Sequence, residues 1–357
     1  MHSLLNKALH HTMKNILLLF TGGTIGSQVK QGCIDTDQSA GFKLIELFQQ
    51  QYSEHVQIRF RSLQPIQILS ENLHPDVWQT LIAAIEAQDL SRYDGIIITH
   101  GTDTLAFTAA ALGIYFHAIK IPLLLVSSNY PLDNPQANGL ANFICAVDFI
   151  RQHQAAGVFV PYQNPGQSMQ VHIGTRLNSC LPLSGDFISV QNKPYLSVEN
   201  GKFVTLHELP DKPPLAFKLQ NQFARIMLIK PYPGLDYRHF KLDNVDAILH
   251  DLYHSGTACV IPQWGDQHSL IEFSAICQQQ GIPVYLAPAI KTADAYSSTQ
   301  QLLAHGVSMV WNSGLETVYA KLCLAYACYT NSNEIAAFLA TNLAWEQVAS
   351  IHSHNTH

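Results

Sequence analysis

Short apolar segments alternate with longer helical patterns along most of the chain, and this alternation constrains the fold more than any other feature. The first five apolar segments lie at residues 15–20, 56–60, 95–99, 122–126 and 157–160. Four of them are almost wholly apolar, as expected of strands that helices cover on both faces. Segment 56–60 alternates apolar and polar residues, which indicates an edge strand. The pattern predicts an α/β fold with a parallel, doubly wound sheet that binds ligands at the carboxyl ends of its strands.

Helical periodicity fills the intervals between these segments, and the alternation resumes after a proline-rich stretch. The helical intervals are residues 42–52, 75–87, 104–116 and 137–153. In the second half, strands are predicted at 225–229, 247–250, 283–286 and 307–310, and helices at 269–280, 298–304, 315–328 and 334–340. We therefore predict a larger N-terminal domain at 13–204, a linker at 205–222 and a smaller C-terminal α/β domain at 223–357.

The composition argues against several functional classes. Charged residues make up 13% of the chain, with 20 Lys and Arg against 26 Asp and Glu and no basic cluster, so neither a nucleic-acid nor a membrane-surface partner is expected. The longest apolar run, 322–329, is too short for a membrane span of about 20 residues. Seven scattered cysteines without a C-x-x-C pair indicate neither a disulfide framework nor a zinc ribbon, and a cytoplasmic location is the simplest expectation.

Two turns rich in glycine and threonine directly follow predicted strands. The first reads Thr-Gly-Gly-Thr-Ile-Gly-Ser at 21–27, and the second reads His-Gly-Thr-Asp-Thr at 100–104. The first has neither the lysine of a P-loop nor the glycine spacing of a dinucleotide loop. A hydroxyl on one turn and a Thr-Asp pair on the other fit acyl transfer, in which a hydroxyl attacks a carbonyl. From the residues alone, a plain tight turn and a helix N-cap explain the same two segments.

The two turns resemble the signature blocks of bacterial-type L-asparaginases, with the cytoplasmic type I branch more similar. The blocks lie at 19–26 and 99–112, and weaker similarities follow at 68–73, 127–142, 232–234 and 315–322. The resemblance implies a flavodoxin-like sheet in the larger domain and hydrolysis of the side-chain amide of L-asparagine to L-aspartate and ammonia. It also implies a small-molecule amino-acid substrate, no metal, no other cofactor, and a homodimer or homotetramer.

The resemblance further assigns roles to seven residues. Thr21 would be the nucleophile, and Thr102 with Asp103 the second catalytic pair. The substrate-binding residues would be Ser70 for the α-carboxylate, Glu71 near the α-amino group, and Gly101 and Ser128 through their backbone.

Two positions depart from the family pattern. Cys33 stands where the family has a tyrosine on a mobile loop, and Gln170 stands where it has a lysine beside the Thr-Asp pair. His172, His100 and Lys193 are candidate replacements for the lysine. Segment 28–41 has no apolar period and is predicted to be a mobile lid over the first turn.

These departures leave several functions open. The chain could hydrolyse asparagine with a different base, act on a shifted amide such as glutamine, or bind an amino acid with impaired catalysis. The family's tRNA-linked amidotransferase subunit is a further alternative, and an additional N-terminal domain is expected of it, whereas about a dozen residues precede Met13 here. Thr257 and His254 are candidates for contact with a neighbouring subunit.

Overall fold

A large, mostly parallel sheet forms the centre of the molecule. The structure is a computed structural model and describes residues 13–23, 25, 27–30, 33–36, 40–153 and 155–350. Eight strands lie in the order β10-β9-β8-β7-β6-β5-β1-β4. The parallel part comprises β4 (Ile58–Leu63), β1 (Lys14–Leu19), β5 (Gly95–Thr99), β6 (Pro122–Val126) and β7 (Gly157–Tyr162). Their order is flavodoxin-like and confirms the predicted fold, with β4 at the edge, as its alternating sequence predicts.

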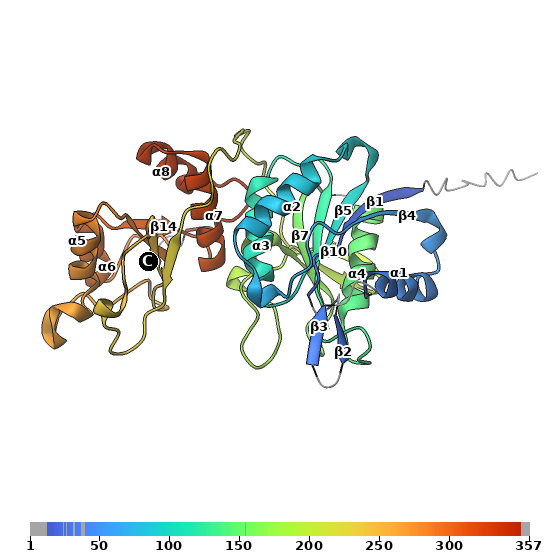
Figure 1. Cartoon of the computed structure of the whole chain (residues 1–357), viewed down its shortest axis with the longest axis horizontal. Helices are drawn as coiled ribbons and strands as arrows, with labels where there is room; N and C mark the ends of the chain where they lie inside the picture. The colour runs from blue at the N-terminus through green and yellow to red at the C-terminus, as the bar shows by residue number, and fades with distance from the viewer. Residues whose placement is uncertain are drawn as a thin grey trace, which may run out of the picture.

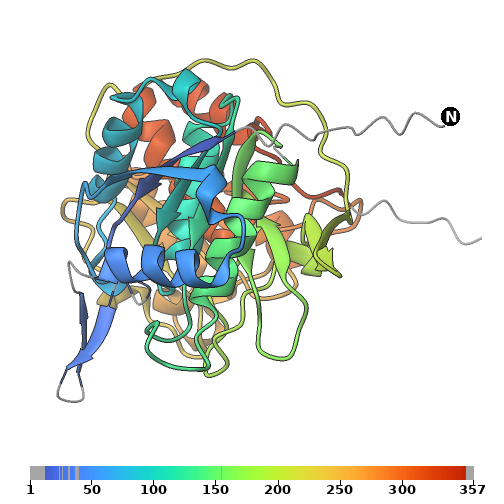
Figure 2. The same ribbon diagram turned by 90° about the vertical axis from the view of Figure 1, so that its right-hand side faces the viewer.

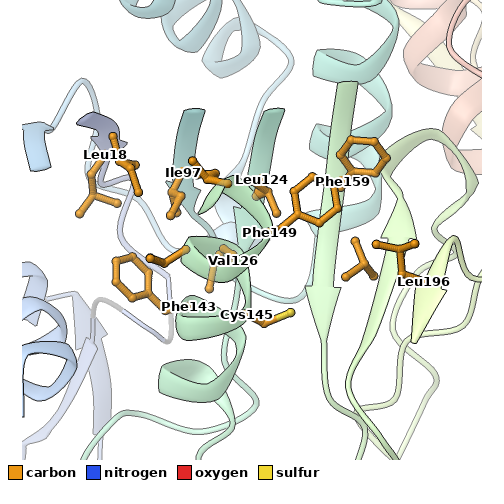
Figure 3. Close-up of a cluster of buried hydrophobic side chains, with 14 of the residues drawn as sticks. Leu18, Ile97, Leu124, Val126, Phe143, Cys145, Phe149, Phe159 and Leu196 are labelled. Carbon is orange, nitrogen blue, oxygen red and sulfur yellow. The ribbon is translucent and has the colours of Figure 1, made fainter. Parts of the chain in front are cut away.

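Helices cover both faces of this sheet, which explains why its strands are continuous apolar runs. α1 (Ala40–Gln51) and α4 (Gly139–Asp148) lie on one face, and α2 (Asp76–Glu86) and α3 (Leu105–Tyr115) lie on the other (Figure 1). Successive side chains of β1 alternate between the two cores: Ile16 and Leu18 pack under α1 and α4, and Leu17 and Leu19 under α2 and α3. Figure 3 shows the first of these cores.

Three short antiparallel strands extend the sheet beyond β7. They are β8 (Gln170–Ile173), β9 (Leu196–Glu199) and β10 (Lys202–Thr205). The sequence pattern does not predict β8 or β9, because four residues are too few to show a period clearly.

A second, four-stranded parallel sheet lies in the C-terminal part, to the left in Figure 1. Its strands are β11 (Ile226–Ile229), β12 (Ala247–His250), β13 (Val284–Ala289) and β14 (Ser308–Trp311). The accompanying helices are α5 (Leu270–Gln279), α6 (Ser297–Ala304), α7 (Leu315–Cys328) and α8 (Ser332–Ala340). All eight elements predicted for this part of the chain are present, and their bounds lie within a few residues of the predicted ones. The domain boundaries at 204 and 223 stay a prediction.

The two sheets are joined by helix packing and by the returning C-terminal segment. α3 packs against α7, where the ring of Tyr319 lies 5.5 Å from Phe107 and 6.3 Å from Trp78. Near the end of the chain Trp345 packs against the core of the large sheet, and Arg176 Nη2 donates to the Gln347 carbonyl at 2.9 Å. Figure 2, turned by 90° from Figure 1, shows the C-terminal helices behind the large sheet. Among the described residues, no helix is long and apolar enough to cross a membrane.

The segment predicted to be a mobile lid contains a β-hairpin. β2 (Ser27–Lys30) and β3 (Cys33–Thr36) pair as an antiparallel hairpin that projects from the larger unit (Figure 1). The sequence pattern does not predict this hairpin, because its two strands pair with each other and need no apolar face. The mobile lid stays a prediction. The side chain of Cys33, and residues 31–32 and 37–39, lie outside the described residues.

Candidate active site

Three loops meet at the carboxyl edge of the parallel strands. β1 and β5 are direct neighbours, with Leu19 opposite Ile98, so the two threonine-bearing turns start side by side. Behind β1, the Gly23 N–H donates to the Ile68 carbonyl at 3.1 Å, and the Ile68 N–H donates to the Thr21 carbonyl at 2.9 Å. The segment that follows β4 is thereby attached to the first turn.

Two glycines allow these loops to touch backbone to backbone. Gly23 has φ +74°, and a Cβ there would lie 2.4 Å from the Gly101 nitrogen. A Cβ on Gly101 would lie 2.3 Å from Ser70 Oγ. Any side chain at either position would separate the loops. The glycines therefore bring Thr21, Ser70 and Asp103 to one place.

Thr21 is buried, and its hydroxyl is already oriented. Its Oγ1 donates to the Thr99 carbonyl at 2.6 Å, and its N–H donates to Thr99 Oγ1 at 3.4 Å. A carbonyl oxygen holds the hydroxyl proton in place but is too weak a base to remove it. Nucleophilic attack by Thr21 therefore needs another group to accept the proton.

Ser70, from the segment after β4, and Asp103, on the second turn, form a reciprocal pair. Ser70 Oγ donates to Asp103 Oδ2 at 3.0 Å and accepts from the Asp103 N–H at 3.2 Å. Thr104 is the N-cap residue of α3, yet it makes no capping bond and donates to the Ser70 carbonyl at 2.9 Å. A helix cap alone therefore does not explain this turn. Thr102 beside it is half-buried.

The other candidate binding residues differ in exposure. Glu71 and Asp103 are exposed and face solvent, as residues that meet an entering ligand do. Ser128 is buried at the end of β6; its hydroxyl donates to the Tyr130 carbonyl at 2.5 Å and accepts from the Gly139 N–H at 3.1 Å. The Ser128 side chain thus shapes its loop, and its backbone is left for a ligand.

Of the three candidate replacements for the family's lysine, only His100 lies on a loop of this site. Its Nδ1 lies 2.8 Å from the Gly101 carbonyl, which can only accept, so Nδ1 is assigned as the protonated nitrogen. Burial lowers the pKa of His100 to about 4, although the Gly101 bond and the Asp103 charge oppose this, so the ring is neutral at pH 7. His172 is buried on β8 beside Ser189, and Lys193 is exposed and donates to Gln191.

Gln170 does not lie where the resemblance puts the family's lysine. It begins β8 and pairs with Tyr162, and three strand spacings of about 4.8 Å, together about 14 Å, separate β8 from β5. The segment closer to Asp103 is the one that contains Cys180. Burial raises the pKa of the Cys180 thiol, and the Asp103 charge raises it further. Only the fold shows this proximity, because no motif marks the Cys180 segment.

No group of three or more histidine, cysteine or acidic side chains in the described part of the chain is placed to hold a metal ion. The roles of the seven site residues stay a prediction.

Comparisons with known proteins agree with this arrangement. The model of the asparaginase N-terminal domain matches residues 15–209. The D subunit of the glutamyl-tRNA(Gln) amidotransferase of Methanosphaera stadtmanae is 27% identical over 357 residues, which cover 96% of this chain and 78% of that one. The same protein of Methanococcus vannielii is 31% identical over 245 residues, covering 65% of this chain and 56% of that one.

Solved structures show the same fold. L-asparaginase I from Vibrio cholerae matches with a TM-score of 0.76 at 23% identity, covering 95% of this chain and 100% of that one. The thermostable L-asparaginase from Thermococcus kodakarensis matches with a TM-score of 0.75 at 23% identity, covering 94% and 100%. Since the family model spans more than half of the residues, the chain belongs to the asparaginase family and is an amidohydrolase.

Proposed function

We propose that the chain hydrolyses the side-chain amide of L-asparagine to L-aspartate and ammonia, with Thr21 as the nucleophile. The observation that carries the proposal is the close approach of three loops, in which Gly101 meets the backbone of Gly23 and the side chain of Ser70. This approach brings the Thr21 turn to the Ser70–Asp103 pair. A hydroxyl for attack and polar groups for an amino acid then share one site.

In the first step, Thr21 Oγ1 attacks the amide carbon. The hydroxyl proton, which is hydrogen-bonded to the Thr99 carbonyl before the reaction, is removed in this step. The carbon–nitrogen bond breaks, the nitrogen takes up a proton and ammonia leaves, which gives an ester on Thr21. In the second step, water held by Thr102 and Asp103 attacks the ester and releases L-aspartate. We assign the proton transfer to the Thr102–Asp103 pair rather than to His100, because His100 is buried and its Nδ1 is held by the Gly101 carbonyl.

The substrate's α-groups need a donor and an acceptor. The Ser70 hydroxyl, already 3.0 Å from Asp103, would turn to donate to the α-carboxylate. The carboxylates of Asp103 and Glu71 would accept from the α-ammonium, with charge-assisted bonds on the order of 1.5–3 kcal/mol each. Gly101 and Ser128 would contribute backbone groups.

The relatives' name favours a second candidate, in which the amide donor is glutamine and the nitrogen passes to an acceptor. An amidotransferase must first release an amide nitrogen, so both candidates share the first step. As further parts of the proposal, the chain acts in the cytoplasm on a small amino acid without a metal or other cofactor. It does so as a homodimer or homotetramer, with Thr257 and His254 near a neighbouring subunit.

Kinetic variants test the proposal. We expect Thr21→Ala and Thr102→Val to lower kcat for ammonia release from L-asparagine by at least about 1,000-fold, since both act in the transition state. Ser70→Ala should instead raise KM by about tenfold, the loss of one charge-assisted bond. Release from glutamine but not asparagine would favour the second candidate. Release from neither, with aspartate still binding, would show an amino-acid-binding protein.

A further inference from the structure

The segment at 174–180, which follows β8, lies between α3 and the first turn of α7, and Figure 1 shows these two helices side by side. On the α3 side, Gly113 has no side chain, and a Cβ there would lie 2.7 Å from Thr175 Cγ2. On the α7 side, Thr317 Oγ1 donates to the Thr175 carbonyl at 2.6 Å, and both threonines are buried. The start of the segment is therefore fixed between the two helices.

Glu316, in the first turn of α7, holds the other end of the segment. Its Oε1 accepts a hydrogen bond from the Ser179 N–H at 2.9 Å. Gly314 precedes α7 and leaves room for this contact, since a Cβ there would lie 3.7 Å from Asn178 Oδ1 and 3.9 Å from Glu316 Oε2. The C-terminal unit thus reaches the loops of the large sheet through one carboxylate.

The surroundings of Glu316 show that its charge carries a cost. Burial raises the pKa of Asp251 at the end of β12, and the nearby charge of Glu316 raises it further, against the opposite effect of Lys230. The helix dipole favours an acidic residue in a first turn, as it does for Glu334 in α8. Because two neighbouring carboxylates repel each other, the dipole alone is a poor account of Glu316, and the bond to Ser179 sets it apart.

Residues 177–189 form a narrow loop whose two arms pair with each other. The Asn178 N–H donates to the Ile188 carbonyl at 3.1 Å, and the Leu181 N–H donates to the Asp186 carbonyl at 2.8 Å. The bond to the α7 carboxylate is made in the first arm, between these two contacts. Since paired arms keep the loop in one shape, this bond sets the position of the whole loop.

The 177–189 loop borders the candidate active site at Asp103. Cys180 packs against the same core as Leu105, which begins α3 directly after the turn that carries Asp103. Burial raises the pKa of the Cys180 thiol, and the charge of Asp103 raises it further, so the two side chains lie near each other. Ser179 directly precedes Cys180. The anchoring bond is therefore one residue away from the part of the loop that meets Asp103.

We propose that Glu316 is a positioning residue of the active site: through Ser179 it holds the 177–189 loop beside Asp103, and the loop sets how Asp103 meets the α-ammonium group of the substrate. This inference rests on the proposed function, which gives the α-ammonium group to Asp103. Glu316 itself contacts neither the substrate nor the reacting atoms. Loss of its bond should weaken ligands that carry an α-ammonium group and leave the attack by Thr21 unchanged.

The test measures binding of L-aspartate, which carries the α-ammonium group, and of succinate, which lacks it, together with ammonia release from L-asparagine. We expect Glu316→Ala to raise Kd for L-aspartate and KM for L-asparagine by about tenfold, the effect of one misplaced charge-assisted bond. Kd for succinate and kcat should each change by less than about twofold. Glu316→Gln keeps an oxygen that accepts from Ser179 and should behave as the wild type does.

A matched control separates this role from a general effect of the helix dipole. Glu334→Ala removes an exposed carboxylate from the first turn of α8 and should change neither dissociation constant, KM nor kcat. Urea unfolding of each variant shows that it is folded under the conditions of the binding and kinetic measurements.

The outcomes distinguish the two proposals. An unchanged KM in Glu316→Ala, equal weakening of L-aspartate and succinate, a fall in kcat as large as the rise in KM, or no rescue by Glu316→Gln would each overturn the inference and leave the proposed function standing. If succinate does not bind the wild type, the comparison of KM with kcat decides. Binding of L-aspartate without ammonia release would overturn the proposed function, and the Kd of L-aspartate in Glu316→Ala and Glu316→Gln would still decide the inference.

Discussion

Acid should destabilise this protein through histidines that are buried in the neutral form, and His172 tests this most cleanly. It is fully buried on β8, its Nδ1 lies 2.7 Å from Ser189 Oγ, and its Nε2 has no hydrogen-bond partner in the described part of the chain. Burial lowers the pKa of His172 from 6.5 to about 4. The unfolded chain therefore binds a proton at pH values where the folded chain does not.

The sign and size of the effect follow from this difference. The stability that the neutral ring contributes is fully present above pH 6.5 and is lost as the pH falls from 6.5 toward 4. The total is about 3 kcal/mol per ring, of which about 2 kcal/mol is lost by about pH 5. His100 and His250 are buried with the same lowered pKa of about 4, so the wild type should lose two to three times as much.

The perturbation is His172→Asn, because an amide can approach Ser189 as Nδ1 does and does not titrate. Urea unfolding at about pH 7.5 and about pH 5 should show the variant losing about 2 kcal/mol less stability than the wild type over this range. His305→Asn is the matched control: His305 is exposed, and its Nδ1 lies 2.8 Å from the Gln301 carbonyl. A wild-type pH dependence that His172→Asn leaves unchanged would refute the reasoning.

Two further predictions concern the site's backbone contact and the buried ion pair at the C-terminus. Gly101→Ala would place a Cβ 2.3 Å from Ser70 Oγ, so kcat/KM should fall by at least about tenfold and the free energy of unfolding by about 1–3 kcal/mol. The control is Gly201→Ala, in open space at φ +73°, which should lower the free energy of unfolding but leave kcat/KM unchanged. Steady-state kinetics and urea unfolding measure the two effects. Glu346 is fully buried and accepts from Lys321 Nζ at 2.6 Å; burial would raise its pKa, but Lys321 and two backbone amides outweigh burial and hold the pKa low. Glu346→Gln leaves the Lys321 ammonium without its counter-ion and should cost about 3–5 kcal/mol of unfolding free energy, and a loss below about 1 kcal/mol would contradict this.

The sequence predicts the sheets well because their strands are buried on both faces. In β1, β5 and β6, every second residue packs into each core, so apolar residues run without interruption and mark the strand. The same reasoning fails for β8 and β9, which are too short to show a pattern, and for the hairpin of β2 and β3, whose strands pair only with each other. A local sequence pattern reveals a strand or helix only where burial requires apolar residues at regular positions.

The site is predictable in part for a related reason. Glycines after strands mark places where backbones approach closely, and the contact of Gly23 with Gly101 confirms this interpretation. The resemblance misplaces Gln170, because distance along a chain does not show how many strands separate two residues. The mutual bonds of Asn129 and Asn138, which shape the loop after β6, have no sequence signature.

Trapping the ester that the proposed mechanism requires is the decisive measurement. Rapid acid quenching during turnover of L-asparagine, followed by peptide mass spectrometry, should find an aspartyl ester on Thr21, the hydroxyl that donates to the Thr99 carbonyl at 2.6 Å. The ester should be absent from Thr21→Ala. An ester on Thr102 or a thioester on Cys180, formed at the rate of ammonia release, would contradict the assignment of Thr21 as the nucleophile.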